Sequence, residues 1–218
     1  MERARRFALW LTGIMAGVFM LQQLFPAVAS SFVLVSADAW SRPWTLFTAI
    51  FLHGGMAHIL FNGLGLVMFG SVLEEIIGSR RFLIVFVTAG LVSSITSTFF
   101  YHSVVGASGA IFGVLGALTV LRPKMTVWVY YIPMPMYIAA AVWAITDLFG
   151  FVMPTNIANA GHLAGLATGI IAGFLIRGKQ PLFSKVAGLG KKPILTAEEF
   201  DKWEEEHMQQ GNEKRGGR

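Results

Sequence analysis

Long apolar runs dominate the sequence, and they constrain the fold more than any other feature. A transmembrane helix needs about 20 apolar residues to cross a hydrocarbon core roughly 30 Å thick. Six runs approach or exceed that length, at residues 7–25, 52–73, 82–100, 106–121, 125–148 and 157–176. Only 13% of the residues are charged, whereas soluble domains carry about 25%. We therefore predict an all-α polytopic membrane helix bundle with six transmembrane helices.

Lysine and arginine gather on one side of these runs. Of the 17 basic residues, 16 lie before the first run, after the sixth, or in the connections after the second and fourth, and Arg42 alone lies on the other side. The positive-inside rule therefore predicts that both termini are cytoplasmic. The same placement accounts for the net charge of +5, because basic residues beside membrane spans contact the lipid bilayer. We therefore predict no nucleic acid as a partner. The first run is too long for the apolar part of a cleaved signal peptide, and the N-terminus does not resemble an organellar transit peptide. These features favour the cell membrane.

The chain divides by composition into two parts. Residues 1–177 form the predicted six-span membrane domain, and residues 178–218 are polar and charged. Within this second part, Thr196 and Glu199 have the spacing of a capping box. We expect a cytoplasmic tail with a short amphipathic helix at about 196–209. Cysteine is absent, which excludes disulfides, thiolate metal sites and a cysteine nucleophile.

Polar side chains inside membrane spans are costly, so they indicate function. Four candidates lie in the even-numbered runs: His58, Asn62, Ser108 and His162. Counting about 1.5 Å per residue from the cytoplasmic end of each run places all four side chains about 18–24 Å above that end. The fourth run is short, and glycines spaced three or four residues apart in the fourth and sixth runs favour close helix packing. We predict a short central span 4 that begins beneath an outward-open, wet cavity.

This combination of residues suits serine hydrolase chemistry. Ser108 supplies a nucleophile, and His162 is the base that activates it. His58 and Asn62 are four residues apart on one helix face, and both can donate hydrogen bonds to an oxyanion. Counted from Lys124, at the cytoplasmic end of the fifth run, Asp147 is about 34 Å above that end. This height is greater than that of the four candidate side chains. We therefore expect a Ser–His dyad without a third member, and expect Asp147 to mark the outer end of span 5.

Each residue also has an ordinary structural explanation. A lone serine in a membrane helix usually bonds its own backbone, and glycines in these runs can serve packing alone. A metal site built from His53, His58 and His162 is disfavoured, because His53 and His58 point to different sides of a helix. The sequence also lacks an H-E-x-x-H motif. We predict neither a metal nor a cofactor.

The same residues resemble the motifs of the rhomboid family of intramembrane serine proteases. Segment 106–109, Gly-Ala-Ser-Gly, is similar to the G-x-S-G nucleophile motif. Segment 53–62 resembles the H-x4-H-x3-N element, and segment 161–169 resembles the motif that carries the catalytic histidine. Segment 70–78 is similar to the G-x3-E-x3-G element at the inner end of span 2. The match covers roughly residues 7–177, the minimal six-span form.

The resemblance implies a function and roles for the site residues. It makes Ser108 the nucleophile, His162 the general base, and His58 and Asn62 part of the oxyanion hole. It implies cleavage of transmembrane protein substrates near the outer face without a cofactor. The chain departs from the family at Gly161, often Ala, and at Phe112, where some members have Tyr beside the catalytic histidine. The Trp-Arg pattern of the first loop also lacks its Arg after Trp44.

Two other classes of protein compete with a protease. One is a non-catalytic membrane protein that binds transmembrane helices for another machine, and the other is a small transporter. A transporter is expected to show internal repeats and interrupted helices at the midplane, and the sequence shows no clear repeat. Labelling of Ser108 by a fluorophosphonate probe would distinguish the protease from both.

Overall fold

The computed structural model describes residues 6–129, 131–153 and 157–177. The chain forms two compact units, Met1–Lys179 and Gln180–Arg218. The whole of the second unit lies outside the described residues, including the helix expected at about 196–209.

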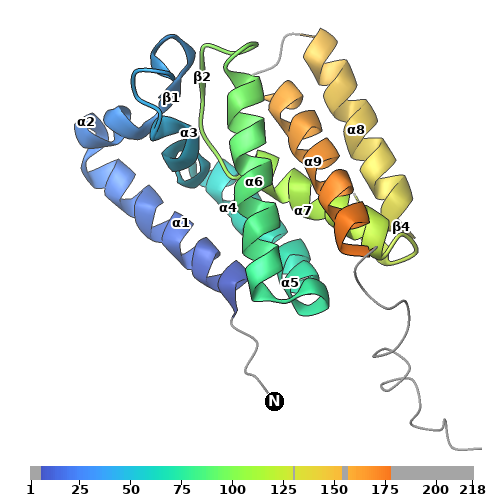
Figure 1. Ribbon diagram of the computed structural model, residues 1–218. Helices are drawn as coiled ribbons and strands as arrows, with labels where there is room; N and C mark the ends of the chain where they lie inside the picture. Colours follow the sequence, from blue (N-terminus) through green and yellow to red (C-terminus); the bar gives the residue numbers. More distant parts are fainter. Residues whose placement is uncertain (1–5, 130, 154–156, 178–218) are drawn as a thin grey trace, which may run out of the picture. The chain divides into compact units, whose positions relative to one another are not determined.

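Helices make up most of the first unit (Figure 1). The longer ones are α1 (Phe7–Leu24), α4 (Met56–Gly65), α5 (Ser71–Ile77), α6 (Ser79–Ser97), α7 (Ser108–Leu121), α8 (Met136–Val152) and α9 (Asn159–Arg177). A π-helical turn, Leu66–Gly70, joins α4 to α5, so that Met56–Ile77 is one continuous helix. Between α1 and α4 the chain makes two short helices, α2 (Pro26–Ala29) and α3 (Thr45–Thr48), and the 3-10 turns Ser30–Phe32, Ser36–Asp38 and Ala49–Phe51.

Strands are few and short. Strand β1 (Leu34–Val35) pairs antiparallel with β2 (Ser103–Val104), which ties the loop after α1 to the loop before α7. Strands β3 (Thr126–Val129) and β4 (Ile132–Pro135) form an antiparallel hairpin in which Thr126 lies opposite Pro135. The fold is therefore predominantly helical, as predicted, with two small two-stranded sheets added.

Four helices in the described part of the chain are long and apolar enough to cross a membrane. They are Phe7–Leu24, Met56–Ile77, Ser79–Ser97 and Asn159–Arg177. Helices α7 and α8 are also apolar but shorter. The short helix predicted at the fourth run is thus present as the 14 residues of α7, equivalent to about 21 Å of helical rise.

The fifth run differs from the prediction. A helix was expected from about residue 125, but Thr126–Pro135 form the hairpin and α8 begins only at Met136. Proline lacks a backbone N–H and blocks the preceding helical turn, so Pro133 and Pro135 prevent a helix from starting earlier. Pro135 instead has a φ of −63° and an extended ψ, and stands directly before the first helical residue.

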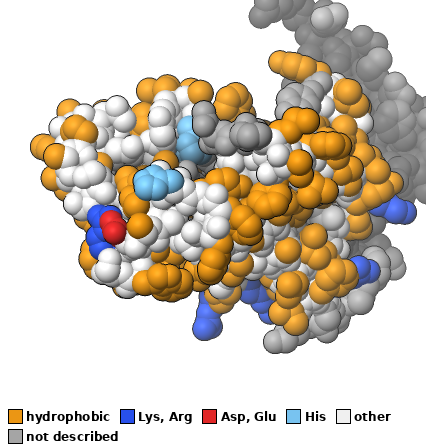
Figure 2. Space-filling model, turned by 90° about the horizontal axis from the view of Figure 1, so that it is seen from above, with side chains coloured by type: hydrophobic (Ala, Val, Ile, Leu, Met, Phe, Trp, Pro, Cys, Tyr) orange, Lys and Arg blue, Asp and Glu red, His pale blue; other side chains and the backbone are white. Residues whose placement is uncertain are grey.

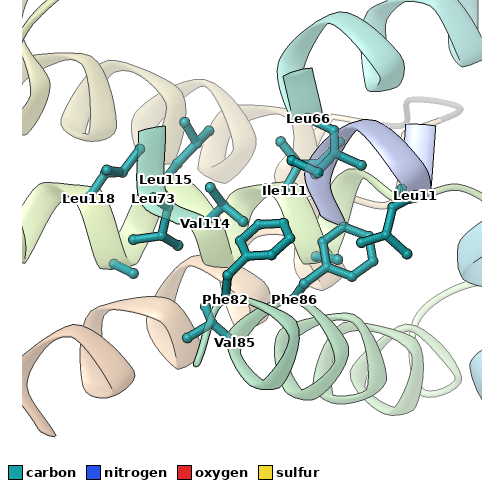
Figure 3. Close-up of a cluster of buried hydrophobic side chains, with 14 of the residues drawn as sticks. Leu11, Leu66, Leu73, Phe82, Val85, Phe86, Ile111, Val114, Leu115 and Leu118 are labelled. Atoms are coloured by element: carbon teal, nitrogen blue, oxygen red, sulfur yellow. The ribbon is translucent and has the colours of Figure 1, made fainter. Parts of the chain in front are cut away.

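Helix α7 lies in the interior of the first unit, where 10 of its 14 residues are buried. Its apolar face packs on side chains from α4–α5, α6 and α1, including Leu66, Leu73, Phe82 and Phe86 (Figure 3). This surrounding core fixes the helix and therefore the residue at its first position.

Helices α7 and α9 approach each other through glycines. A methyl group added to Gly165 would lie 2.9 Å from the backbone carbon of Gly109, and one added to Gly169 would lie 2.6 Å from that of Gly113. Real side chains do not approach so closely, so only glycine permits this backbone contact. Small residues at such spacing are typical of close helix pairs in membranes. The contact brings the beginnings of α7 and α9 together, and both predicted catalytic residues lie there.

Candidate active site

Ser108 and His162 meet at the N-terminal ends of α7 and α9. Ser108 is the first residue of α7, and His162 lies in the first turn of α9. The Oγ of Ser108 is 2.8 Å from Nε2 of His162, although the residues are 54 positions apart in the chain. The structure therefore brings the predicted pair within hydrogen-bonding distance.

The turn before Ser108 depends on Gly106. This residue has a φ of +124°, which L side chains rarely adopt, and its N–H donates to the Ala49 carbonyl over 2.8 Å. A methyl group at this position would also lie 2.7 Å from Nε2 of His58. Glycine is required both for the backbone conformation and for the space that the His58 ring occupies.

Asp147 is placed differently from the sequence expectation. Its Oδ1 lies 3.0 Å from Nδ1 of His162, so the acid is in the catalytic layer and not above it. The expectation was wrong because it counted helical rise from Lys124, whereas α8 starts at Met136. From Met136 to Asp147 the helix advances by eleven residues, so Asp147 is only about 17 Å above the start of α8. The prolines of the hairpin were the signal in the sequence that would have corrected the count.

A cavity of about 970 Å³ opens beside the Ser108–His162 pair. Its lining comes from α4, the loop before α7, and helices α7, α8 and α9, and includes His58, Asn62, Phe112 and Trp143. Figure 2 views the molecule from above Figure 1, and histidine side chains are visible on this face among apolar ones. All four side chains predicted from the sequence, His58, Asn62, Ser108 and His162, line this one cavity.

His58 and Asn62 lie on α4 and line the cavity together with residues of α8 and α9. The Nδ1 of His58 accepts a hydrogen bond from the Gly54 N–H over 3.3 Å. The amide nitrogen of Asn62 donates to the His58 carbonyl over 2.9 Å, and the residue is buried. A primary amide has two N–H groups, so this bond occupies only one of them.

Two departures from the family pattern have structural counterparts. The ring of Phe112 stacks on His162, with centroids 4.4 Å apart and planes at 11°. A phenylalanine thus supplies the flat apolar wall that limits rotation of the imidazole. A methyl group at Gly161 would lie 2.8 Å from Oγ of Ser93 on α6. Buried serines of α6 fill the space that an alanine at position 161 would need.

The geometry supports acyl transfer chemistry. A histidine nitrogen 2.8 Å from a serine hydroxyl can take its proton as the oxygen attacks a carbonyl. The first N–H groups of an α-helix have no partner inside the helix, and those of α7 begin at Ser108. In the described part of the chain, no three His, Cys, Asp or Glu side chains are grouped to hold a metal ion.

The fold defines a multi-pass membrane protein with a polar cavity among its apolar helices. A family model described as "Rhomboid domain" matches residues 41–179. The chain belongs to the rhomboid family.

Curated relatives agree with this assignment. The chain is 40% identical to "Rhomboid protease GluP" of Bacillus subtilis over 142 residues, 64% of this chain and 26% of the relative. It is 34% identical to "RHOMBOID-like protein 1" of Arabidopsis thaliana over 65% of this chain and 37% of that one. It is 30% identical to "Rhomboid protease GlpG" of Klebsiella pneumoniae over 61% of this chain and 48% of that one. The matched region thus spans only about a quarter to a half of these relatives.

Proposed function

We propose that the protein is an intramembrane serine endopeptidase that cleaves transmembrane segments of other membrane proteins. The observation that carries the proposal is the hydrogen bond between Ser108 and His162 beside a cavity enclosed by apolar helices. Relatives named as rhomboid proteases support the same class of reaction. The substrate is the membrane-protein segment that enters the cavity, and the reaction uses no cofactor or metal.

The mechanism has two halves. In the first, Nε2 of His162 takes the hydroxyl proton of Ser108 while Oγ bonds to the scissile carbonyl carbon, whose C=O electron pair moves onto the oxygen. The C–N bond then breaks, the amine takes the proton from Nε2, and an acyl-enzyme remains. In the second half, a water molecule loses a proton to His162 and attacks the ester. The acid is released as Ser108 regains its proton.

The oxyanion forms beside the N-terminus of α7. The unpaired N–H groups there and the helix dipole both favour negative charge. We assign His58 and Asn62 as further donors, because they line the same cavity and both carry N–H groups. Donors that are already oriented when the substrate arrives stabilise the developing charge most effectively.

The proposed topology has six spans with both termini in the cytoplasm. Helices α7 and α8 complete the six, and a helix of 14 residues suffices for α7 because it is buried in protein. The Phe7 end of α1, the turn between α5 and α6 and the Arg177 end of α9 lie at the lower side in Figure 1, which the positive-inside rule makes cytoplasmic. Residues 178–218 then form a cytoplasmic tail with a short amphipathic helix.

Topology is testable because the chain contains no cysteine. Single cysteines can be placed at exposed positions in the predicted outer loop and inner turn, as Ser41→Cys and Arg81→Cys, and in the tail as Arg218→Cys. We expect a membrane-impermeant maleimide to label Ser41→Cys in intact cells, and the other two only after permeabilisation. Labelling of Arg218→Cys in intact cells would overturn the assignment of the C-terminus.

The experiment that tests the function is activity-based labelling of the purified full chain. A fluorophosphonate probe should label Ser108, and the same preparation in liposomes should cleave a reconstituted single-span substrate. The competing function is that of a non-catalytic binding protein. It predicts substrate binding without labelling and without cleavage, and that result would reject the protease.

A further inference from the structure

The described residues contain two buried acids, Glu74 and Asp147, and the mechanism above does not use Asp147, the one that contacts His162. Asp147 is 6% exposed and comes from α8, which contributes neither the nucleophile nor the base. A buried carboxylate within a membrane bundle is costly and is normally paired or functional. We propose, on the basis of the proposed serine protease function, that Asp147 is a positioning residue that orients His162 and fixes its tautomer.

The tautomer follows from hydrogen-bonding capacity. An ionised carboxylate only accepts hydrogen bonds, so the 3.0 Å contact to Asp147 requires the proton of neutral His162 to sit on Nδ1. The other ring nitrogen, Nε2, is then left with its lone pair directed at the Ser108 hydroxyl 2.8 Å away. The acid thus keeps the imidazole in the form that can act as a base, and without it both tautomers would be populated.

Asp147 is better suited to the reacting state than to the resting state. Its Oδ2 is buried and has no hydrogen-bond partner among the described residues. A purely structural carboxylate would be expected to have its acceptors satisfied. When His162 takes the serine proton it becomes a cation 3.0 Å from this carboxylate, and the attraction between them increases. An interaction that is stronger in the transition state than in the ground state accelerates the reaction.

Three side chains from two helices constrain the ring together. Phe112 of α7 stacks on one face of the imidazole at 4.4 Å, Ser108 of α7 contacts Nε2, and Asp147 of α8 contacts Nδ1. The stacking restrains the plane of the ring but does not determine which of its two nitrogens carries the proton. Asp147 is the group that distinguishes them. The other titratable side chains that line the cavity are those of His58, Tyr101 and His102, whereas the recorded contact of Nδ1 is with Asp147.

The test compares Asp147→Asn with Asp147→Glu in the full-length protein. Asparagine keeps the size but loses the charge, and its amide can donate to Nδ1 and so favour the wrong tautomer. We expect Asp147→Asn to lower kcat about 10²- to 10⁴-fold, the range over which general base catalysis contributes, with KM changed less than about twofold. Asp147→Glu should recover part of the loss, because it restores a carboxylate. Asp38→Asn, an exposed acid paired with Arg42, is the matched control and should cleave at the wild-type rate.

Two further measurements separate positioning from structural support. Substrate affinity is measured in the Ser108→Ala background, where Asp147→Asn should leave binding unchanged. Nitrogen-15 NMR of the histidines should show His162 protonated on Nδ1 in the wild type, with the proton moved toward Nε2 in Asp147→Asn. A folded Asp147→Asn with wild-type kcat would overturn the proposal, and so would weakened binding with an unchanged kcat.

The wild-type spectrum keeps the proposal testable if Asp147→Asn fails to fold. Protonation of His162 on Nε2 in the native protein would overturn the role of Asp147 without any variant. Failure of the proposed function is recognised separately, since a wild-type protein that neither labels nor cleaves rejects the protease whatever the tautomer.

Discussion

Ser108→Ala and His162→Ala are each expected to abolish cleavage of a reconstituted single-span substrate while leaving the protein folded. Removal of Ser108 deletes the oxygen that bonds to the scissile carbon, and removal of His162 deletes the group that takes its proton. Loss of one member of such a pair costs on the order of 10⁶-fold in kcat. The measurement is the rate of product formation in liposomes, with thermal unfolding as the check on folding.

A matched serine variant controls for the loss of a hydroxyl group. The Oγ of Ser30 is exposed and donates only to the nearby Ala27 carbonyl, so Ser30→Ala should cleave like the wild type. The double variant of Ser108 and His162 should be no slower than either single one, because the two residues act as a unit. Substantial cleavage by either folded single variant would show that the pair is misassigned.

The sequence predicted the pair because its signals are local. Ser108 follows Gly106 in a short apolar run, and His162 stands between glycines at four-residue spacing. These glycines identify the faces along which α7 and α9 meet, and the structure places their backbones in contact there. A local pattern was sufficient, because each residue lies within one turn of the start of its helix.

Asp147 could not be placed in the same way. Its height depends on where α8 begins, and apolar composition alone does not distinguish a β-hairpin from the first turns of a helix. Residues 126–129 are apolar or β-branched and suit either structure, and only the prolines at 133 and 135 indicate the break. Starting the helix at Lys124 and not at Met136, an error of twelve residues, moved the acid about 18 Å away from the histidine that it contacts. The π-helical turn in Met56–Ile77 likewise left no clear signal in the sequence.

The arrangement also explains why the site lies at helix ends. A serine in mid-helix would be surrounded by backbone groups that are already paired, whereas at the first position of α7 the N–H groups remain available. The β1–β2 pair and the bond from Gly106 to Ala49 hold the loop that leads into this position. The fold therefore supplies the proposed nucleophile and base from two separate helices, and a common core fixes the position of α7.

Asn62→Ala and His58→Ala are expected to slow cleavage without abolishing it. Removal of one oxyanion donor typically costs about 10²- to 10³-fold in rate, and the N–H groups of α7 remain in both variants. His58→Ala should have the larger effect, because its ring also packs against Gly106 in the turn that presents Ser108. The measurements are kcat for the single-span substrate and the rate of Ser108 labelling by a fluorophosphonate probe.

The labelling rate separates charge stabilisation from proton transfer. Both variants should still be labelled slowly by the probe, because His162 remains in place to activate Ser108. If Asn62→Ala cleaves at the wild-type rate, its amide serves only to bond the His58 carbonyl within α4. If a folded His58→Ala cannot be labelled at all, His58 rather than His162 would act as the base. That outcome would also remove the reason for a carboxylate at Nδ1 of His162, so the roles of His162 and Asp147 would be rejected together.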